Sequence, residues 1–147
     1  MGQGMEKTKV LILCTGNSAR SQMAEGILGH LSQGALDVAS AGTHPSFVHP
    51  LAIQAMREAG VDISNHRSKS VEEFAGKHFD VVITVCDRAN ENCPVFPGAE
   101  RIHFSFEDPA AIQGTEERTL RAFRRTRDEL FQRLRLFLAT RPKQQTA

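Results

Sequence analysis

The chain has 147 residues, of which 40% are apolar and 24% are charged, and its formal net charge is +1 at pH 7. This length and apolar content are enough for one domain with a single core. A charge so close to zero excludes a general positive field that would hold nucleic acid or an anionic membrane. No stretch reaches the roughly 20 apolar residues of a membrane span, and the polar start of the chain lacks the apolar core of a signal peptide, so we expect a cytoplasmic protein.

Strand-like and helix-like segments alternate along the first two thirds of the chain. In chain order, the expected elements are a strand at 10–13, a helix at 22–31, a strand at 36–41, a helix from about 50 to 60, and strands at 80–85 and 101–104. Pro50 is expected to open the second helix and Gly60 to end it. In that helix, Ile53, Met56 and Ala59 are expected to lie on one face.

The last third of the chain contains one long helical pattern. Residues 90–97 hold two prolines and are expected to be irregular. From Thr115 to Thr140, apolar residues recur at steps of three, four and seven, which predicts an amphipathic helix with Thr115 as a candidate N-cap. Five arginines are expected to form its solvated face: Arg118, Arg121, Arg124, Arg125 and Arg127.

This alternation predicts a single α/β domain with a four-stranded parallel sheet, in the order 2-1-3-4, flanked by helices on both faces. We expect residues 9–140 to form the domain, residues 1–8 to be loosely ordered and residues 141–147 to form a tail. In an open α/β sheet, ligands bind at the C-terminal ends of the strands where the strand order reverses. Cys14 and Cys86 follow the first and third strands, so we expect both cysteines there.

The segment from Cys14 to Ser21 follows a strand and begins a helix, so its backbone N–H groups can converge on one anion. The predicted oxyanion-binding residues are Thr15, Gly16, Asn17, Ser18, Ala19 and Arg20. Gly16 and Asn17 tolerate the positive φ that a tight loop needs, and Arg20 can donate two parallel hydrogen bonds to the anion. A helix N-terminus and an arginine lower the pKa of a nearby thiol, so Cys14 is predicted to be a thiolate nucleophile, with Ser21 as a hydrogen-bond donor to it.

The sequence from Cys14 to Ser21 resembles the phosphate-binding loop of the low-molecular-weight protein tyrosine phosphatases and of the arsenate reductases that share their fold. Five segments resemble the thioredoxin-coupled arsenate reductases in the same order: 11–26, 40–42, 62–66, 86–97 and 106–110. The resemblance implies reduction of arsenate to arsenite with thioredoxin as the reductant and without a cofactor. We expect a monomer for which phosphate and sulfate are competing oxyanions.

The chain has three cysteines and no export signal, which argues against a structural disulfide framework. A reductase must deliver two electrons to its ligand and recover them, and extra thiols can do so. The resemblance implies that Cys14 attacks arsenic, that Cys86 then attacks Cys14, and that Cys93 finally attacks Cys86. It also implies that Asp108 is the general acid that protonates the leaving oxygen.

Two other functions remain open from the sequence. A low-molecular-weight phosphatase would hydrolyse phosphate esters through Cys14 alone, without needing Cys86 or Cys93. The chain has no tyrosine or tryptophan that could flank a phosphotyrosine substrate, which favours a small inorganic oxyanion. A redox-sensing or anion-binding module without turnover would bind the anion but release no product.

No metal site is expected, because the histidines lack paired ligand spacing and are interpreted as surface or hydrogen-bonding residues. Some members of the family that the sequence resembles bind a monovalent cation, with residues that correspond to Asn17, Glu25 and Ser40. In this chain Arg67 and Lys69 occupy the segment that would complete such a site. We therefore expect no cation, with the Lys69 ammonium in its place.

Overall fold

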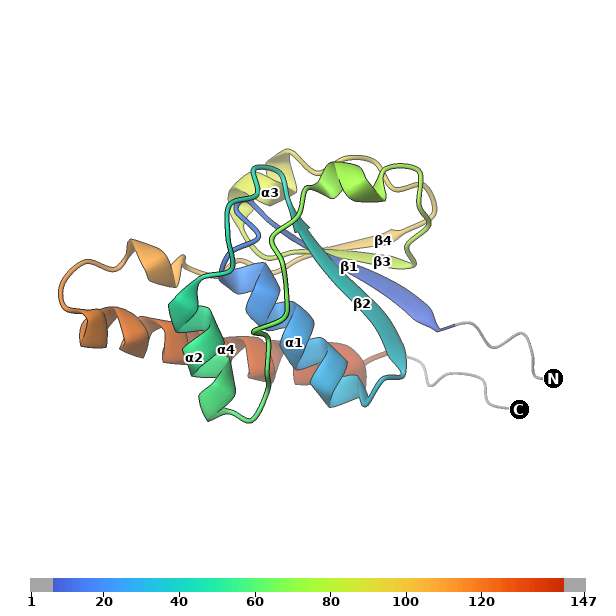
Figure 1. The fold of residues 1–147 in the computed structure, drawn as a ribbon. Coiled ribbons are helices and arrows are strands. Elements are labelled where there is room, and N and C mark those ends of the chain that lie inside the picture. The colour runs from blue at the N-terminus through green and yellow to red at the C-terminus, as the bar shows by residue number, and fades with distance from the viewer. Residues whose placement is uncertain (1–6, 142–147) are drawn as a thin grey trace.

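Four parallel strands form the centre of the structure, a computed structural model that describes residues 7–141 (Figure 1). The strands are β1 (Thr8–Cys14), β2 (Leu36–Gly42), β3 (Val81–Thr84) and β4 (Glu100–His103). Their order in the sheet is β2-β1-β3-β4, which confirms the predicted topology. Because β1 and β3 are parallel neighbours, with Leu13 opposite Thr84, the segments that follow them leave the same edge of the sheet.

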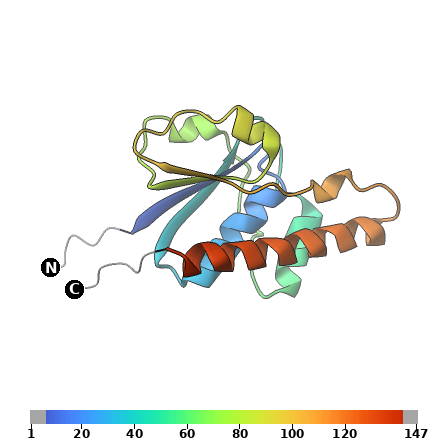
Figure 2. The same ribbon diagram turned by 180° about the vertical axis from the view of Figure 1, so that it is seen from behind.

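Three longer helices lie on one side of the sheet and two short elements on the other (Figures 1 and 2). The longer helices are α1 (Arg20–Ser32), α2 (Pro50–Glu58) and α4 (Glu116–Ala139). The short elements are the 3-10 turn η1 (Val71–Phe74) and the helix α3 (Asp87–Glu91), and a second 3-10 turn, η2 (Pro109–Ala111), precedes α4. The predicted α/β domain with helices on both faces is confirmed, although the two faces are covered unequally.

The core lies between the sheet and the three longer helices. All four residues of β3 are buried, as expected for a strand covered on both faces. The apolar stripe predicted for α4 is also buried: Leu120, Phe123, Leu130, Leu134 and Phe137. The Thr115 side chain accepts a hydrogen bond from the Arg118 amide at 3.1 Å, so the predicted N-cap is confirmed.

Two local predictions hold only in part. Of the residues expected on one face of α2, Met56 is buried, while Ile53 and Ala59 are only partly buried. The helix also buries Ala52 and Ala55, because it packs against α1 and α4 through small side chains. The segment predicted to be irregular from residue 90 begins inside α3, which continues to Glu91. Its prolines come after the helix has ended and therefore do not prevent it.

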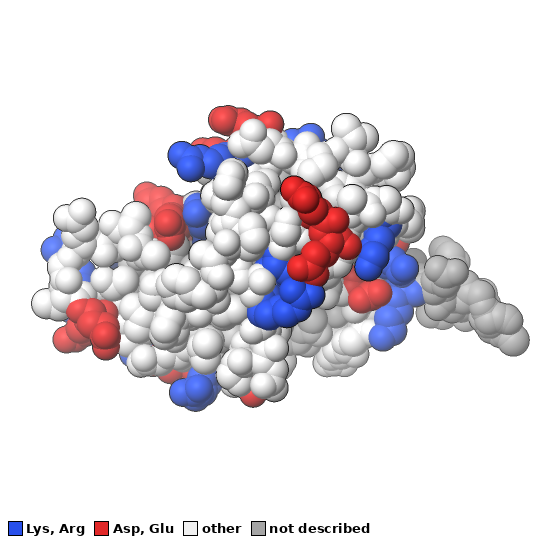
Figure 3. Space-filling view, turned by 45° about the horizontal axis from the view of Figure 1, so that its top comes forward, with Lys and Arg blue, Asp and Glu red and all other residues white. Residues whose placement is uncertain are grey.

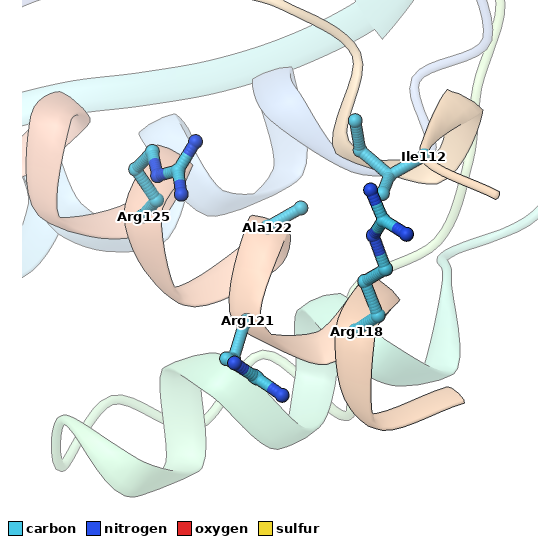
Figure 4. Close-up of a pocket in the computed structure, with 5 residues that line it drawn as sticks. All are labelled: Ile112, Arg118, Arg121, Ala122 and Arg125. Carbon is cyan, nitrogen blue, oxygen red and sulfur yellow. The ribbon is translucent and has the colours of Figure 1, made fainter. Parts of the chain in front are cut away.

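The arginines predicted to be the solvated face of α4 have two different environments. Three of them are exposed and line a shallow pocket with Ile112 and Ala122, their guanidinium groups pointing in different directions (Figure 4): Arg118, Arg121 and Arg125. Arg124 and Arg127 instead contact the Glu58 carboxylate of α2, at 2.7 and 3.4 Å. The prediction is wrong for Arg127, whose side chain is only 14% exposed, whereas Arg124 stays 39% exposed; both residues join α4 to α2.

The predicted loose N-terminus (1–8) and tail (141–147) lie almost wholly outside the described residues, and Thr8 already belongs to β1. Between residues 7 and 141, no helix is long and apolar enough to cross a membrane. On the face shown in Figure 3, acidic and basic side chains are interspersed and form no field of one sign.

Candidate active site

The segment from Cys14 to Arg20, here called the oxyanion loop, is held by hydrogen bonds to its carbonyl oxygens. Four amides from the segment that follows β2 donate to them: Thr43 to Cys14 (3.3 Å), His44 to Thr15 (2.8 Å), Ser46 to Gly16 (3.0 Å) and His49 to Ser18 (3.0 Å). In a trans peptide the N–H points away from the C=O, so the amides of the loop face the opposite way, toward its centre. Within the described residues, the amides of residues 16–19 have no hydrogen-bond acceptor.

The N-terminus of α1 adds further donors at the same place. Its N-cap, Ala19, has no side chain that could bind the first-turn amides, and the first turn contains no acidic residue. The first amides of a helix have no intrahelical partner and carry a partial positive charge. The loop and the helix together therefore offer a set of N–H donors to an anion.

Asn17 is the residue that fixes the shape of the oxyanion loop. It is fully buried, and its φ of 47° is the only positive value in the loop, so the same expectation for Gly16 is wrong. Its Nδ2 donates to the hydroxyls of Ser21 and Ser40, at 2.8 and 2.9 Å, and its Oδ1 accepts from the Lys69 amide at 2.9 Å. These bonds fix a strained backbone conformation from three different segments.

Ser21 lies in this network rather than against the thiol. Its buried hydroxyl accepts from Asn17, and no hydrogen bond joins it to Cys14 among the described residues. The predicted contact between Ser21 and a Cys14 thiolate is therefore absent. Ser21 instead stabilises the residue that shapes the loop.

Gly42 at the end of β2 allows the oxyanion loop to approach the sheet. A Cβ atom at this position would lie 2.5 Å from the Thr15 carbonyl oxygen and 2.9 Å from the Asn17 nitrogen. Both distances are shorter than any van der Waals contact, so a side chain here would displace the loop.

Arg20 reaches from the first turn of α1 to the Asp108 segment. Its NH1 donates to the Phe106 carbonyl oxygen at 2.9 Å, and its NH2 lies 3.9 Å from Oδ2 of Asp108. Its Nε is buried and has no partner among the described residues. A buried donor without an acceptor is costly, which is consistent with a site that binds an anion.

Cys14 and Cys86 are both buried and hydrogen bond to each other. The bond to Cys86 and burial raise the pKa of Cys14, whereas the bond from Cys14 lowers the pKa of Cys86 to about 5, with help from the Thr15 hydroxyl and the Ala89 amide. Those two donors lie 3.3 and 3.4 Å from the Cys86 sulfur. The hydrogen bond between the two sulfurs therefore favours deprotonation of Cys86, whereas the sequence draws attention to Cys14.

Cys93 lies two residues beyond the end of α3, and all three cysteines are free thiols. Its thiol donates to the Pro94 carbonyl oxygen at 3.3 Å, and burial raises its pKa. It lines a surface pocket with Val82, Phe96 and Arg101. Cys93 is thus separated from Cys86 by a helix.

Charged side chains gather next to the oxyanion loop, around Lys69, the residue expected to take the place of a cation. The Lys69 Nζ lies 3.8 Å from Oε1 of Glu25, which accepts a hydrogen bond from Ser40 at 2.6 Å. His66 lies 3.8 Å from the other oxygen of Glu25. In the described part of the chain, no group of three or more His, Cys, Asp or Glu residues could hold a metal ion.

His49 is a site residue that the sequence did not single out. Its Nδ1 accepts from the Leu51 amide at 3.1 Å and so caps α2, and its amide supports the oxyanion loop through Ser18. Its ring packs on Phe123 with centroids 4.7 Å apart, and this burial lowers its pKa while the charge of Asp108 opposes the shift. Pro50 at the first helical position marks the preceding residue as the N-cap, and this signal could have identified His49.

The fold and the site together define a class of protein. A parallel sheet in the order 2-1-3-4, with a cysteine-to-arginine loop after its first strand whose carbonyl oxygens are bonded to the next segment, is the architecture of cysteine-based phosphatase-like proteins. The chain belongs to the family described as low molecular weight phosphotyrosine protein phosphatase, whose sequence profile matches residues 9–147.

Among its relatives are several proteins named as arsenate reductases. One from Halalkalibacterium halodurans is 42% identical over 137 residues, which cover 92% of this chain and 99% of that protein. A solved structure of an arsenate reductase in its oxidized state superposes with a TM-score of 0.77 at 35% identity, covering 90% of this chain and 97% of the other. A thioredoxin-dependent arsenate reductase from Corynebacterium glutamicum has a TM-score of 0.66 at 27% identity, covering 91% of this chain and 65% of the other.

Proposed function

We propose that the protein is an arsenate reductase that reduces arsenate to arsenite through three cysteines and is restored by thioredoxin. The observation that carries the proposal is the contact between Cys14 and Cys86, which joins a nucleophile in an anion-binding loop to a second buried thiol. A phosphatase has no use for this second thiol. The full-length similarity to proteins named as arsenate reductases supports the same function.

Binding comes first. The amides of residues 16–19 and the guanidinium of Arg20 offer donors to the oxygens of a tetrahedral anion. Charge-assisted hydrogen bonds from an arginine to an oxyanion are about twice as strong as neutral ones. Phosphate and sulfate have the same shape as arsenate, so we expect both to compete.

The chemical steps follow from the placement of the thiols. The Cys14 sulfur attacks arsenic as its proton moves to a bound oxygen, and Asp108, across from Arg20, protonates the oxygen that leaves as water. The Cys86 thiolate then attacks the Cys14 sulfur, and the electron pair of the sulfur–arsenic bond stays on arsenic, which leaves as arsenite. A thiolate at Cys86 suits this second attack, because only the deprotonated sulfur is nucleophilic.

Cys93 completes the cycle. Its thiolate attacks Cys86, Cys14 leaves as a thiolate, and the disulfide moves to Cys86–Cys93 near the protein surface. Thioredoxin then reduces that disulfide by the same exchange chemistry. We further propose that the protein acts as a monomer in the cytoplasm, where its three free thiols would remain reduced between turnovers.

The alternative is a phosphatase that uses the same oxyanion loop, as the family description suggests. It requires Cys14, Arg20 and Asp108 but neither of the other cysteines. The residues after Asp108 in η2 are Pro109, Ala110 and Ala111, which supply no aromatic ring to hold a phosphotyrosine. This favours the inorganic substrate.

The test is an assay of arsenite release with thioredoxin, thioredoxin reductase and NADPH, run beside an assay of phosphate-ester hydrolysis. The proteins compared are the wild type and the variants Cys14→Ser, Cys86→Ser and Cys93→Ser. We expect each substitution to abolish multiple-turnover reduction and only Cys14→Ser to abolish hydrolysis. Ester hydrolysis by the wild type without any arsenite release would instead identify a phosphatase.

A further inference from the structure

The helix α3 separates the two cysteines that exchange a disulfide in the proposed relay. Cys86 is the N-cap of α3 and Cys93 lies two residues beyond its end, so a helix about 7.5 Å long lies between them, whereas the Cα atoms of a disulfide are about 5.5–6 Å apart. Cys86 and Cys93 therefore cannot bond while α3 keeps its form. The helix must open when the disulfide forms and close when it is reduced.

Contacts with β4 hold this helix closed. An isolated helix as short as Asp87–Glu91 is not stable in water, so its form depends on the rest of the protein. Asp87, its first residue, contacts Nε2 of His103 at 2.9 Å. Near its C-terminal end, Arg101 donates to the carbonyl oxygen of Asn90 and, at 3.1 Å, to its Oδ1.

The two contacts are joined by a buried threonine of β3. The Thr84 hydroxyl donates to Oδ1 of Asn90 at 3.3 Å and also lies 2.8 Å from Nδ1 of His103. Asn90, Thr84 and His103 thus form one chain of hydrogen bonds that runs between the helix and the sheet. The hydrogen bond from His103 is also the largest cause of the lowered pKa of Asp87.

We propose that His103 and Arg101, through Asp87 and Asn90, form a clamp that stabilises the helical, reduced state of the Cys86–Cys93 segment and so makes its disulfide easier to reduce. The proposal rests on the relay described above. His103 is a positioning residue in this account, because it touches neither the oxyanion nor a sulfur atom. The clamp opens when the Cys93 thiolate attacks Cys86, the Cys86–Cys93 bond forms, the Cys14–Cys86 bond breaks and Cys14 leaves with the electron pair.

The experiment measures the equilibrium between the Cys86–Cys93 dithiol and its disulfide in buffers of reduced and oxidised glutathione. All proteins carry Cys14→Ser, so that only one intramolecular disulfide can form, and its fraction is determined by alkylation and mass spectrometry. His103→Gln and Asp87→Asn are compared with the parent. Arg101 is not used, because its charge also acts on the pKa of Cys93.

We expect each substitution to raise the equilibrium constant for disulfide formation by about three- to fivefold, as suits the loss of one partly exposed hydrogen bond to a carboxylate. The double variant should gain less than the sum of the two single variants, because both remove the contact between Asp87 and His103. Arg88→Gln is the matched control, since this exposed residue of α3 makes none of these side-chain contacts, and it should leave the constant unchanged.

Equal constants in the parent, His103→Gln and Asp87→Asn would overturn the clamp, and so would a failure of the parent to form the disulfide. The measurement uses no arsenate and no thioredoxin. A wild type that releases no arsenite would therefore refute the proposed function separately, while the equilibrium constants would still decide for or against the clamp.

Discussion

The oxyanion loop and the segment from Cys86 to Cys93 lie at the same edge of the sheet but are held in opposite ways. The loop is fixed by backbone hydrogen bonds to its carbonyl oxygens and by the buried side chain of Asn17. The second segment is built on a single short helix that side chains hold to the sheet, and Val95, two residues beyond the segment, is 86% exposed. The first region can bind an anion without changing shape, whereas the second can change shape at low cost.

This difference matches the two tasks of the proposed reaction. An oxyanion is bound best by donors that are already in position, because no reorganisation is needed when it arrives. A disulfide relay needs a segment with two accessible conformations. If this comparison is right, the oxyanion loop must be rigid and the segment from Cys86 to Cys93 must be able to change its conformation.

The largest effect is expected for Arg20→Lys. Lysine keeps the charge but cannot donate to the Phe106 carbonyl oxygen and to an oxyanion through one planar group. Arsenite formation should fall by roughly 10²–10³-fold, as for the loss of an oxyanion donor, and inhibition by phosphate should weaken in parallel. Initial rates and phosphate inhibition constants measure both effects, and activity close to that of the wild type would show that Arg20 is not an anion ligand.

Gly42→Ala should distort the oxyanion loop, because the new Cβ would lie 2.5 Å from the Thr15 carbonyl oxygen. We expect a loss of about 1–3 kcal/mol in the free energy of unfolding, as for overpacking in a rigid core, together with weaker phosphate binding. Gly29→Ala in α1 is the control, since its Cβ would meet nothing within 4 Å. It should stabilise the protein by about 0.5–1 kcal/mol. Urea unfolding that ranks the two variants equally would argue against a rigid loop.

Thr15→Val should raise the pKa of Cys86, because it removes the hydroxyl 3.3 Å from the sulfur. The wild-type thiolate should persist as the pH falls to about 5, and in the variant it should be protonated at higher pH. Thiolate absorbance near 240 nm during an acid titration follows the change. Thr43→Val, whose hydroxyl contacts His44 instead, should titrate like the wild type. Identical curves for all three proteins would mean that Thr15 does not support the thiolate.

The smallest effect is expected for Glu58→Gln, which weakens the contact between α2 and α4 away from both regions. The hydrogen bond from Arg124 lowers the pKa of Glu58 to about 2, below the usual 4.3 of an unfolded glutamate. Its contribution to stability is therefore complete above about pH 4.3 and is lost as the pH falls through about 2. The difference in Tm between wild type and variant should be constant near neutral pH and should vanish in acid. A difference that persisted at pH 2 would assign the effect to packing.

Much of the fold could be predicted from the sequence because it depends on local patterns. The β-branched run before Cys86 and the apolar spacing of α4 determine their elements, and the strand order follows from the handedness of the crossovers. The wrong predictions concern features that depend on distant partners. Arg124 and Arg127 are indistinguishable in sequence from their exposed neighbours until α2 brings Glu58 against them.

The same limit applies to the site. The cysteine, the arginine and the glycine-containing loop between them could be identified because they are adjacent in sequence. The lowered pKa of Cys86 could not be predicted, because it depends on a hydrogen bond with Cys14, which is 72 residues away in the sequence. The clamp of α3 by His103 likewise exists only because β4 pairs with β3.

The most direct test of the central claim is a single turnover. The reduced protein is mixed with excess arsenate in the absence of thioredoxin, and arsenite and the disulfide-linked peptides are quantified together. The three-cysteine relay predicts about one arsenite per chain and a Cys86–Cys93 disulfide in the wild type, with a Cys14–Cys86 disulfide accumulating in Cys93→Ser. Arsenite formed without either disulfide, or no arsenite at all, would contradict it.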